Sequence, residues 1–198
     1  MKAVVIGPGR IGCGFAGQLL RASGHQVVFA ARNPVVADHF NRVGRYGVRL
    51  VGGPETREII VDGVRAVSTA EPEQVAEEIS DAGMIVTAVG AGSLPDVAPL
   101  IAAGLRRRSK LVNVLAFENL SNAGPYLRDL VASHLSSDFP LAEHGFSGVL
   151  VSRAVTQQLG DPAGDEPLVF IGDPPVHFVV DGPSLRRPLP AIEGMIVA

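Results

Sequence analysis

The first thirty residues constrain the fold more than any other part of the chain. A continuous apolar run, Ala3–Ile6, ends at a glycine, and residues 10–23 then carry apolar side chains at helical spacing before Gly24. A second apolar run, Gln26–Ala30, follows directly. Strand, helix and strand within about thirty residues form a βαβ unit. Its right-handed crossover makes the two strands parallel, so the pattern predicts an α/β protein.

The composition agrees with a parallel sheet covered by helices. Hydrophobic residues make up 46% of the 198 residues, while aromatic residues make up 5% and tryptophan is absent. The core must therefore be built from Val, Ile, Leu and Ala, as in sheets that are buried on both faces. This length suits one well-buried domain, and we expect a single domain over 1–198.

Charge and cysteine content exclude several classes of protein. A net charge of −3 provides no basic field for nucleic acid, and the basic run 106–110 is expected to be a solvated helix end. One cysteine allows no internal disulfide, and no Cys or His pairs recur at metal-ligand spacing. The apolar run that stops at Gly7 is too short for a signal peptide, and no run approaches the ~20 residues of a membrane span. We therefore expect a cytoplasmic protein without a metal.

The remaining chain alternates between strand and helix signals. Residues 46–68 show apolar alternation broken by turn signals, which predicts a small antiparallel insertion. Further helices are expected at 72–80, 95–105 and 125–135, and further strands at 84–88, 111–115, 168–171 and 177–180. Gly and Pro become frequent after Pro140, so a β-rich edge is expected at 145–198. The prediction is a Rossmann-type, doubly wound, mostly parallel sheet.

The turn after the first strand has the spacing G-x-G-x-x-G. Gly7 permits the tight turn, Gly9 lets a pyrophosphate approach the backbone, and Gly12 lets helix and sheet pack closely. The N–H groups at the start of the helix attract anions, so Arg10 and Ile11 join the predicted dinucleotide site. Cys13 is interpreted as a small packing residue.

The end of the second strand indicates which dinucleotide is bound. An acid that holds the ribose of NAD is expected there, but Ala31, Arg32 and Asn33 occupy the place. A carboxylate would repel a 2′-phosphate, whereas a guanidinium pairs with it through two parallel N–H bonds. NADP(H) is therefore the preferred cofactor, with Arg32 and Asn33 as ligands, and NAD(H) stays open as an alternative. Asp38 is a poorer candidate for the acid, because it should lie on the next helix.

Other strand ends should complete the cofactor site. Cofactors bind at the carboxyl ends of strands in doubly wound sheets. Ala88, Val89 and Gly90 follow one strand, and Glu118 and Asn119 follow another. Glu118 is the best ionisable group there, although it is equally well interpreted as an acid that holds its loop.

Lysine and histidine provide no obvious base. The two lysines, Lys2 and Lys110, precede strands and should lie at the opposite edge of the sheet, and the histidines are scattered without paired spacing.

Several motifs in order along the chain resemble one family. They are the glycine turn, Ala88-Val89-Gly90, Phe117-Glu118-Asn119-Leu120, the run from Gly145 to Val155, and Leu189-Pro190-Ala191-Ile192-Glu193-Gly194-Met195. Together they resemble the N-terminal domain of the long-chain polyol (mannitol) dehydrogenase family, which includes mannitol-1-phosphate 5-dehydrogenase. The resemblance implies a nicotinamide-binding Rossmann domain. It also implies a following helical domain with a catalytic lysine, which we expect to lie outside these residues.

The resemblance also bears on catalytic residues. Asn119 matches an asparagine whose amide would donate to the substrate oxygen as alkoxide charge develops. Ser152-Arg153 stands where the family usually has Asp-Arg, so a carboxylate is lost. The candidate catalytic residues are Asn119, Glu118 and Arg153.

Three functional hypotheses follow. The first is an NADP-dependent oxidoreductase acting on a polyol, a ketose or a related phosphorylated compound, with this chain supplying the cofactor-binding domain. The second is an enzyme complete at this length, and the third is a non-catalytic NADP(H) sensor or interaction module. The expected partner is a small-molecule substrate, without nucleic acid or membrane, and an exposed β edge would favour a homodimer.

Overall fold

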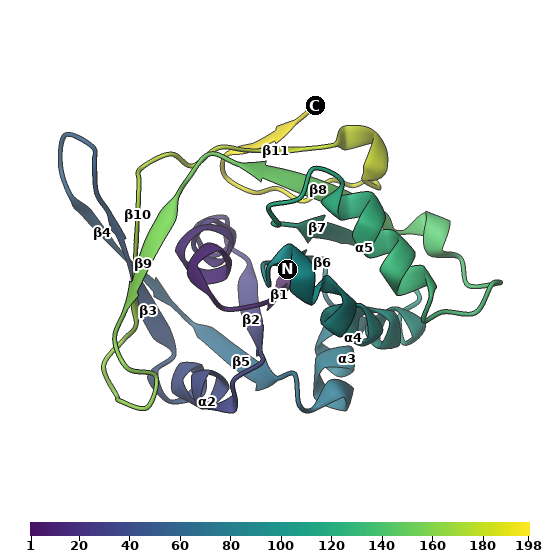
Figure 1. The fold of residues 1–198 in the computed structure, drawn as a ribbon, viewed down its shortest axis with the longest axis horizontal. Coiled ribbons are helices and arrows are strands. Elements are labelled where there is room, and N and C mark those ends of the chain that lie inside the picture. Colours follow the sequence, from purple (N-terminus) through teal and green to yellow (C-terminus); the bar gives the residue numbers. More distant parts are fainter.

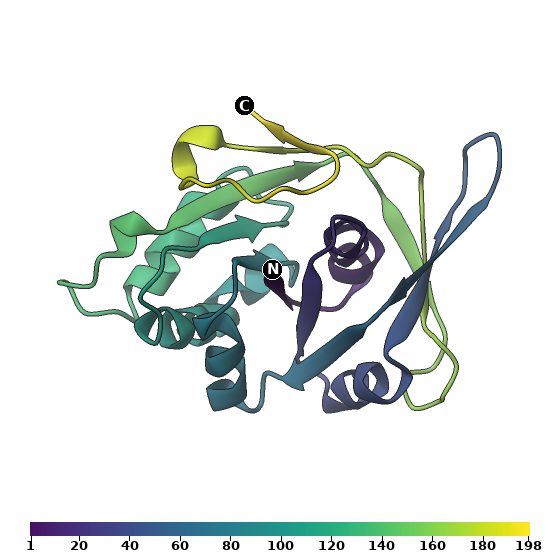
Figure 2. The same cartoon turned by 180° about the vertical axis from the view of Figure 1, so that it is seen from behind.

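The computed structural model describes all 198 residues, which form two sheets with helices packed around them (Figures 1 and 2). The main sheet has eight strands in the order β12-β11-β8-β7-β6-β1-β2-β5, and the second has four in the order β4-β3-β10-β9. The strands of the main sheet are β1 (Lys2–Ile6), β2 (Gln26–Ala31), β5 (Val64–Ser68), β6 (Met84–Thr87), β7 (Asn113–Ala116), β8 (Gly145–Val151), β11 (Phe178–Val180) and β12 (Met195–Val197). Those of the second sheet are β3 (Arg45–Leu50), β4 (Arg57–Asp62), β9 (Val155–Leu159) and β10 (Val169–Gly172).

The helices lie between and beside these strands. The first begins with a π-helical segment, η1 (Gly12–Gly17), that continues as α1 (Gln18–Ala22). The others are α2 (Pro34–Val43), α3 (Pro72–Ser80), α4 (Leu94–Arg106) and α5 (Ala123–Ala132), with short 3-10 turns η2 (Ala91–Ser93), η3 (Leu141–Glu143) and η4 (Gly182–Ser184). None of the helices is long and apolar enough to span a membrane.

The centre of the main sheet is parallel, which confirms the predicted fold class. β1 pairs in parallel with β2 and β6, and its last residue, Ile6, is opposite both Ala30 and Thr87. β5, β7 and β8 continue the parallel order, whereas β11 is antiparallel to β8. The residues that follow β1, β2 and β6 therefore meet at one edge of the sheet.

The sheet has a separate core on each face. One core joins the sheet to α3, α4 and α5 through 23 buried residues. The other core has 29 buried residues and surrounds the first helix, which lies between the two sheets, as Figure 1 shows. Most of the aromatic residues gather in this second core, where Phe15 packs edge-on against Phe117 and Phe178, and Tyr46 packs against Phe170.

The boundaries of the predicted insertion need correction. Within residues 46–68, only β3 and β4 pair in antiparallel fashion, because Val64–Ser68 is β5 and pairs in parallel with β2. The apolar alternation at 64–68 has another cause. Because β5 is an edge strand, Arg65 is exposed between two buried neighbours, and this gives the same alternation as a hairpin strand. Gly63, with φ +63°, turns the chain from the second sheet back to the main one.

The β-rich C-terminal segment is confirmed, and the structure divides it between the sheets. β8, β11 and β12 extend the main sheet, whereas β9 and β10 complete the second sheet, with β10 parallel to β3. The predicted strand at 111–115 is β7, which begins two residues later, at Asn113. The predicted helix at 125–135 is α5, which begins earlier, at Ala123.

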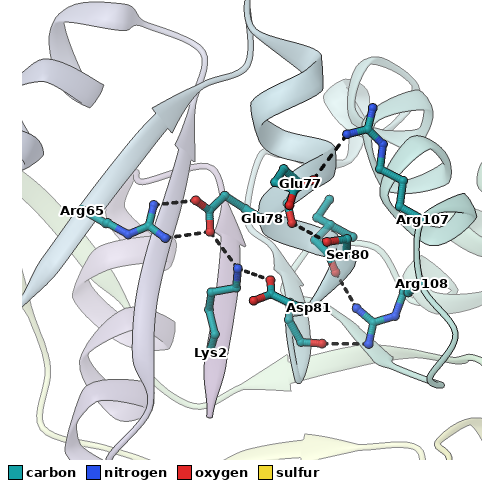
Figure 3. A network of polar contacts seen from close by, with 10 residues as sticks. Lys2, Arg65, Glu77, Glu78, Ser80, Asp81, Arg107 and Arg108 are labelled. Carbon is teal, nitrogen blue, oxygen red and sulfur yellow. Dashed lines mark hydrogen bonds and ion pairs between the residues drawn. The ribbon is translucent and has the colours of Figure 1, made fainter.

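The amino-terminal edge of the sheet is held by the polar network of Figure 3. The carboxylate of Glu78 accepts hydrogen bonds from Nη1 and Nη2 of Arg65, both at 2.7 Å, and from the ammonium of Lys2 at 2.8 Å. Hydrogen bonds from Arg65 lower the pKa of Glu78, with a smaller contribution from Lys2. Lys2 also forms an ion pair with Asp81. This lysine thus lies at the amino-terminal edge of the sheet, opposite the cofactor edge, as the sequence predicts.

The basic run after α4 belongs to the same network. Arg107 pairs with Glu73 and, at 3.7 Å, with Glu77. Arg108 donates to the carbonyl oxygens of Ile79 at 2.5 Å and Ala82 at 2.8 Å. These arginines thus bind the end of α4 along α3, from its first turn at Glu73 to the residues after its last turn, which is more than the solvated turn expected from the sequence.

Candidate functional site

A cleft of about 370 Å³ opens at the carboxyl ends of the parallel strands. Its lining comes from the glycine turn, from the ends of β2, β5 and β6, and from the first turns of α2 and α4. Six of the predicted cofactor-binding residues meet there, namely Gly7, Gly9, Arg32, Asn33, Ala88 and Val89. The other predicted ones, Arg10, Ile11, Gly12, Gly90 and Asn119, are not part of its lining.

The three motif glycines meet different constraints. Gly7 has φ +97°, and a Cβ there would lie 2.5 Å from the carbonyl oxygen of Ala88. A Cβ on Gly12 would lie 1.9 Å from the carbonyl oxygen of Gly7, so the helix approaches the turn as closely as backbone allows. A Cβ on Gly9 would meet nothing within 4 Å. Gly9 thus leaves open space beside the cleft, as a ligand approaching the backbone requires.

The helix that follows the turn presents free backbone N–H groups. Cys13 N donates to Gly9 O at 2.8 Å, which closes the first helical turn. The N–H groups of Arg10, Ile11 and Gly12 precede this bond and have no partner within the helix. Such a terminus suits an anionic group. The side chain of Arg10 is directed elsewhere, because it donates to Thr156 O at 3.2 Å.

The π-helical segment η1 is held from outside by two side chains. Tyr46 Oη donates to Cys13 O at 3.0 Å, and Arg153 Nη1 donates to Gly14 O at 2.9 Å. Burial raises the pKa of the Tyr46 hydroxyl, which keeps its proton, and burial raises the pKa of the Cys13 thiol, which leaves it unreactive. The first helix is therefore tied both to the second sheet and to the segment after β8.

Arg153 is enclosed by the protein. Its side chain also donates to Gln18 Oε1 and to Pro175 O, both at 2.9 Å, and its guanidinium lies 5.1 Å from the ring centre of Phe15. The residue is 2% exposed, Nη2 has no hydrogen-bond partner, and burial lowers the pKa of the guanidinium. The substrate contact expected for Arg153 has no support in this geometry, because the guanidinium contacts the backbone of the first helix instead.

Glu118 joins two loops at the cleft edge of the sheet. Its carboxylate accepts the N–H of Val89 at 3.0 Å and the N–H of Gly90 at 2.8 Å, and the residue is 7% exposed. The geometry favours the interpretation of Glu118 as an acid that holds its loop. Asn119 follows it and is exposed.

Several lining residues carry no signal in the predicted motifs. Thr69 follows β5, and its N–H donates to Ala31 O at 2.9 Å, which places it beside the end of β2. Assigning β5 to the parallel sheet would have predicted this position. Ser93 lies immediately before α4, and Asp96, Val97 and Leu100 follow it on one face of that helix. That face could have been found from the helical period alone.

The cleft contains one side chain of each charge. Arg32 follows β2, Asp96 lies in the first turn of α4, and both are exposed. Neither takes part in any salt bridge of the structure. Next to Arg32, Asn33 caps α2 by accepting the N–H of Val35 at 3.0 Å. Arg32 therefore stands beside a helix N-terminus, and both favour an anion.

The family model and the most similar relatives point to the same protein family. Residues 1–194 match the mannitol dehydrogenase Rossmann domain. The chain is 36% identical over 204 residues to mannitol-1-phosphate 5-dehydrogenase of Brevibacillus brevis, and 37% identical over 202 residues to that of Geobacillus thermodenitrificans. Each match covers 98% of this chain and 51% of the relative, so the chain spans about half their length.

A solved structure with a similar fold is octopine dehydrogenase in complex with NADH and agmatine. It matches with a TM-score of 0.65 at 14% identity, over 100% of this chain and 48% of that one. At this identity the likeness extends to the fold only.

Proposed function

This chain belongs to the mannitol dehydrogenase family through its Rossmann domain, and on that premise we propose that it is the cofactor-binding part of an NADP(H)-dependent oxidoreductase. Its substrate is a polyol, a ketose or a phosphorylated relative of these. The observation that carries the proposal is the presence of Arg32, in place of an acid, at the end of β2 inside the cleft.

The groups around Arg32 suit a 2′-phosphate. The guanidinium is exposed and can pair with phosphate oxygens through two N–H bonds. The N-terminus of α2 adds partial positive charge, and Thr69 carries a hydroxyl on the same lining. Ala31, at the last position of β2, cannot repel a phosphate as a carboxylate would.

The glycine turn suits a pyrophosphate. Open space at Gly9 and the unpaired N–H groups of Arg10, Ile11 and Gly12 provide an anion site that is built from backbone donors. When bound, the nicotinamide cofactor would supply the hydride chemistry. The chain's own residues bind and orient it, and the carboxylate of Glu118 holds the loop at Val89 and Gly90 that borders the site.

Asn119 is the residue that we assign to the substrate. Its exposed amide follows β7 and can donate to a carbonyl or alkoxide oxygen. We assign Arg153 to holding the first helix rather than to the substrate. The 198 residues act as one Rossmann domain, and we place the proton-transferring base outside them.

The test is a pair of fluorescence titrations, NADPH against NADH, on the wild-type chain and on Arg32→Asp. We expect NADPH to bind at least tenfold more tightly to the wild type, a difference of ~1.4 kcal/mol, and Arg32→Asp to abolish or reverse this preference. Arg128→Asp is the matched control, since Arg128 is exposed on α5 and outside the cleft. An unchanged preference in Arg32→Asp would refute the assignment, and absence of binding by either nucleotide would refute the proposed function.

A further inference from the structure

Asp96 is an acid in the first turn of α4. It is exposed, it belongs to no salt bridge, and it lies on the face of α4 that lines the cleft. An acid in the first turn of a helix is favoured by the helix dipole, and any first-turn position would satisfy that preference. Glu73, in the first turn of α3, shows the usual outcome because it pairs with Arg107 outside the cleft.

Apolar side chains share the cleft with Asp96. Val97 and Leu100 from α4, and Val36 from α2, line the same cleft. Asp96 is the only acidic side chain of that lining, and Arg32 is the only basic one. The cleft is thus a slot of mixed lining, in which apolar side chains and the uncharged polar residues Asn33, Thr69 and Ser93 surround one carboxylate from α4 and one guanidinium from the β2–α2 connection.

A purine base with an exocyclic amine matches this slot. Its ring faces are suited to contact with apolar side chains, while its amine donates hydrogen bonds at the ring edge. An ionised carboxylate only accepts hydrogen bonds, and a bond from a neutral donor to it is stronger than one between two neutral groups. Hypoxanthine carries a carbonyl oxygen where adenine carries the amine, so the carboxylate would face another acceptor.

We propose that Asp96 selects the adenine base of the cofactor by accepting a hydrogen bond from its exocyclic amine. This inference rests on the proposed function for the existence of a dinucleotide site. It is independent of the choice between NADP(H) and NAD(H), because Arg32 would select the phosphate and Asp96 the base. Removal of either residue should therefore leave the other selection intact.

The experiment compares NADPH with its hypoxanthine analogue, reduced nicotinamide hypoxanthine dinucleotide phosphate, by fluorescence titration. The wild-type chain should prefer NADPH by at least about tenfold, as expected for a lost hydrogen bond to a charged group. In Asp96→Asn the amide can donate to the hypoxanthine oxygen, so the preference should fall below about threefold. Asp38→Asn, an exposed acid on α2 outside the cleft lining, is the control and should keep the wild-type preference.

The outcomes separate this inference from the proposed function. Equal wild-type binding of the two analogues overturns the role of Asp96, and so does a preference that survives in Asp96→Asn. If the wild type binds NADPH while either of these results is obtained, the proposed function stands and only the base selection fails. If Arg32→Asp loses the preference for NADPH over NADH but keeps the preference for adenine, the two roles are independent, as proposed. Thermal melting of each variant confirms that the chain is folded.

Discussion

Replacing Arg153 by methionine should destabilise the chain without touching the cleft. The substitution keeps much of the apolar volume but removes every donor of the guanidinium. Gly14 O, Gln18 Oε1 and Pro175 O then lose their partner inside the protein. Gly14 and Gln18 are buried, and each buried acceptor left without a hydrogen bond costs about 1–3 kcal/mol, so the gross loss is about 2–6 kcal/mol. Pro175 is exposed, so its carbonyl oxygen can bond to water instead.

Part of this loss is offset. The guanidinium is buried without a carboxylate within salt-bridge distance, and Nη2 has no partner, so removing the charge recovers part of its desolvation energy. We expect a net destabilisation of about 1–3 kcal/mol, which corresponds to about 2–12 °C in Tm for a domain of this size. Urea and thermal denaturation measure it. Arg128→Met, an exposed change on α5, should stay within about 0.5 kcal/mol of the wild type.

The same variants separate two roles for Arg153. If it holds the first helix, Arg153→Met lowers stability and weakens NADPH binding, because the free N–H groups of that helix lose their fixed orientation. A Tm equal to that of the wild type would refute this reasoning. Unchanged stability and unchanged NADPH affinity, with loss of turnover in an active form of the enzyme, would return Arg153 to the substrate contact expected from the sequence.

Two further predictions concern the turn and the opposite edge of the sheet. Gly12→Ala places a Cβ 1.9 Å from a carbonyl oxygen and should lower the free energy of unfolding in urea by at least about 1–3 kcal/mol. A Cβ at Gly9 has nothing within 4 Å, so Gly9→Ala should leave stability unchanged and weaken NADPH binding. Equal stability of the two variants would contradict this prediction. Because Arg65 lowers the pKa of Glu78 in the folded state, the stabilisation from Glu78 is complete above its ordinary value of 4.5 and is lost as the pH falls through the folded value. Thermal melts of Glu78→Gln should therefore lie below those of the wild type at neutral pH and converge with them in acid, and a constant gap would contradict the assignment.

Much of the fold could be predicted because its signals are local. The strand, turn, helix and strand of the first thirty residues are specified by apolar spacing and glycine, and α3 was expected over 72–80 as observed. The prediction was wrong at β5, where an edge strand of the parallel sheet shows the same alternation as a hairpin strand. Local patterning reports which side chains are buried but not which strand is the neighbour.

The residues of the cleft also divide into those that local sequence patterns predict and those that depend on the strand order. Gly7, Gly9 and Arg32 could be predicted to lie together because a single βαβ unit carries all of them. Thr69 and Asp96 reach the same cleft from β5 and α4, and only the strand order brings those elements beside β2 and β1.

The backbone turn after β1 and the charge at the end of β2 can be inferred from the amino-acid sequence, because each depends on the residue at one position. A positive φ at Gly7 and a guanidinium at Arg32 are local properties. The surroundings of Arg153 depend on how the chain packs, because this residue lies 139 positions from the carbonyl that it binds. Whether an arginine meets a substrate or a buried carbonyl depends on what packs around it, and distant segments of the chain supply those neighbours.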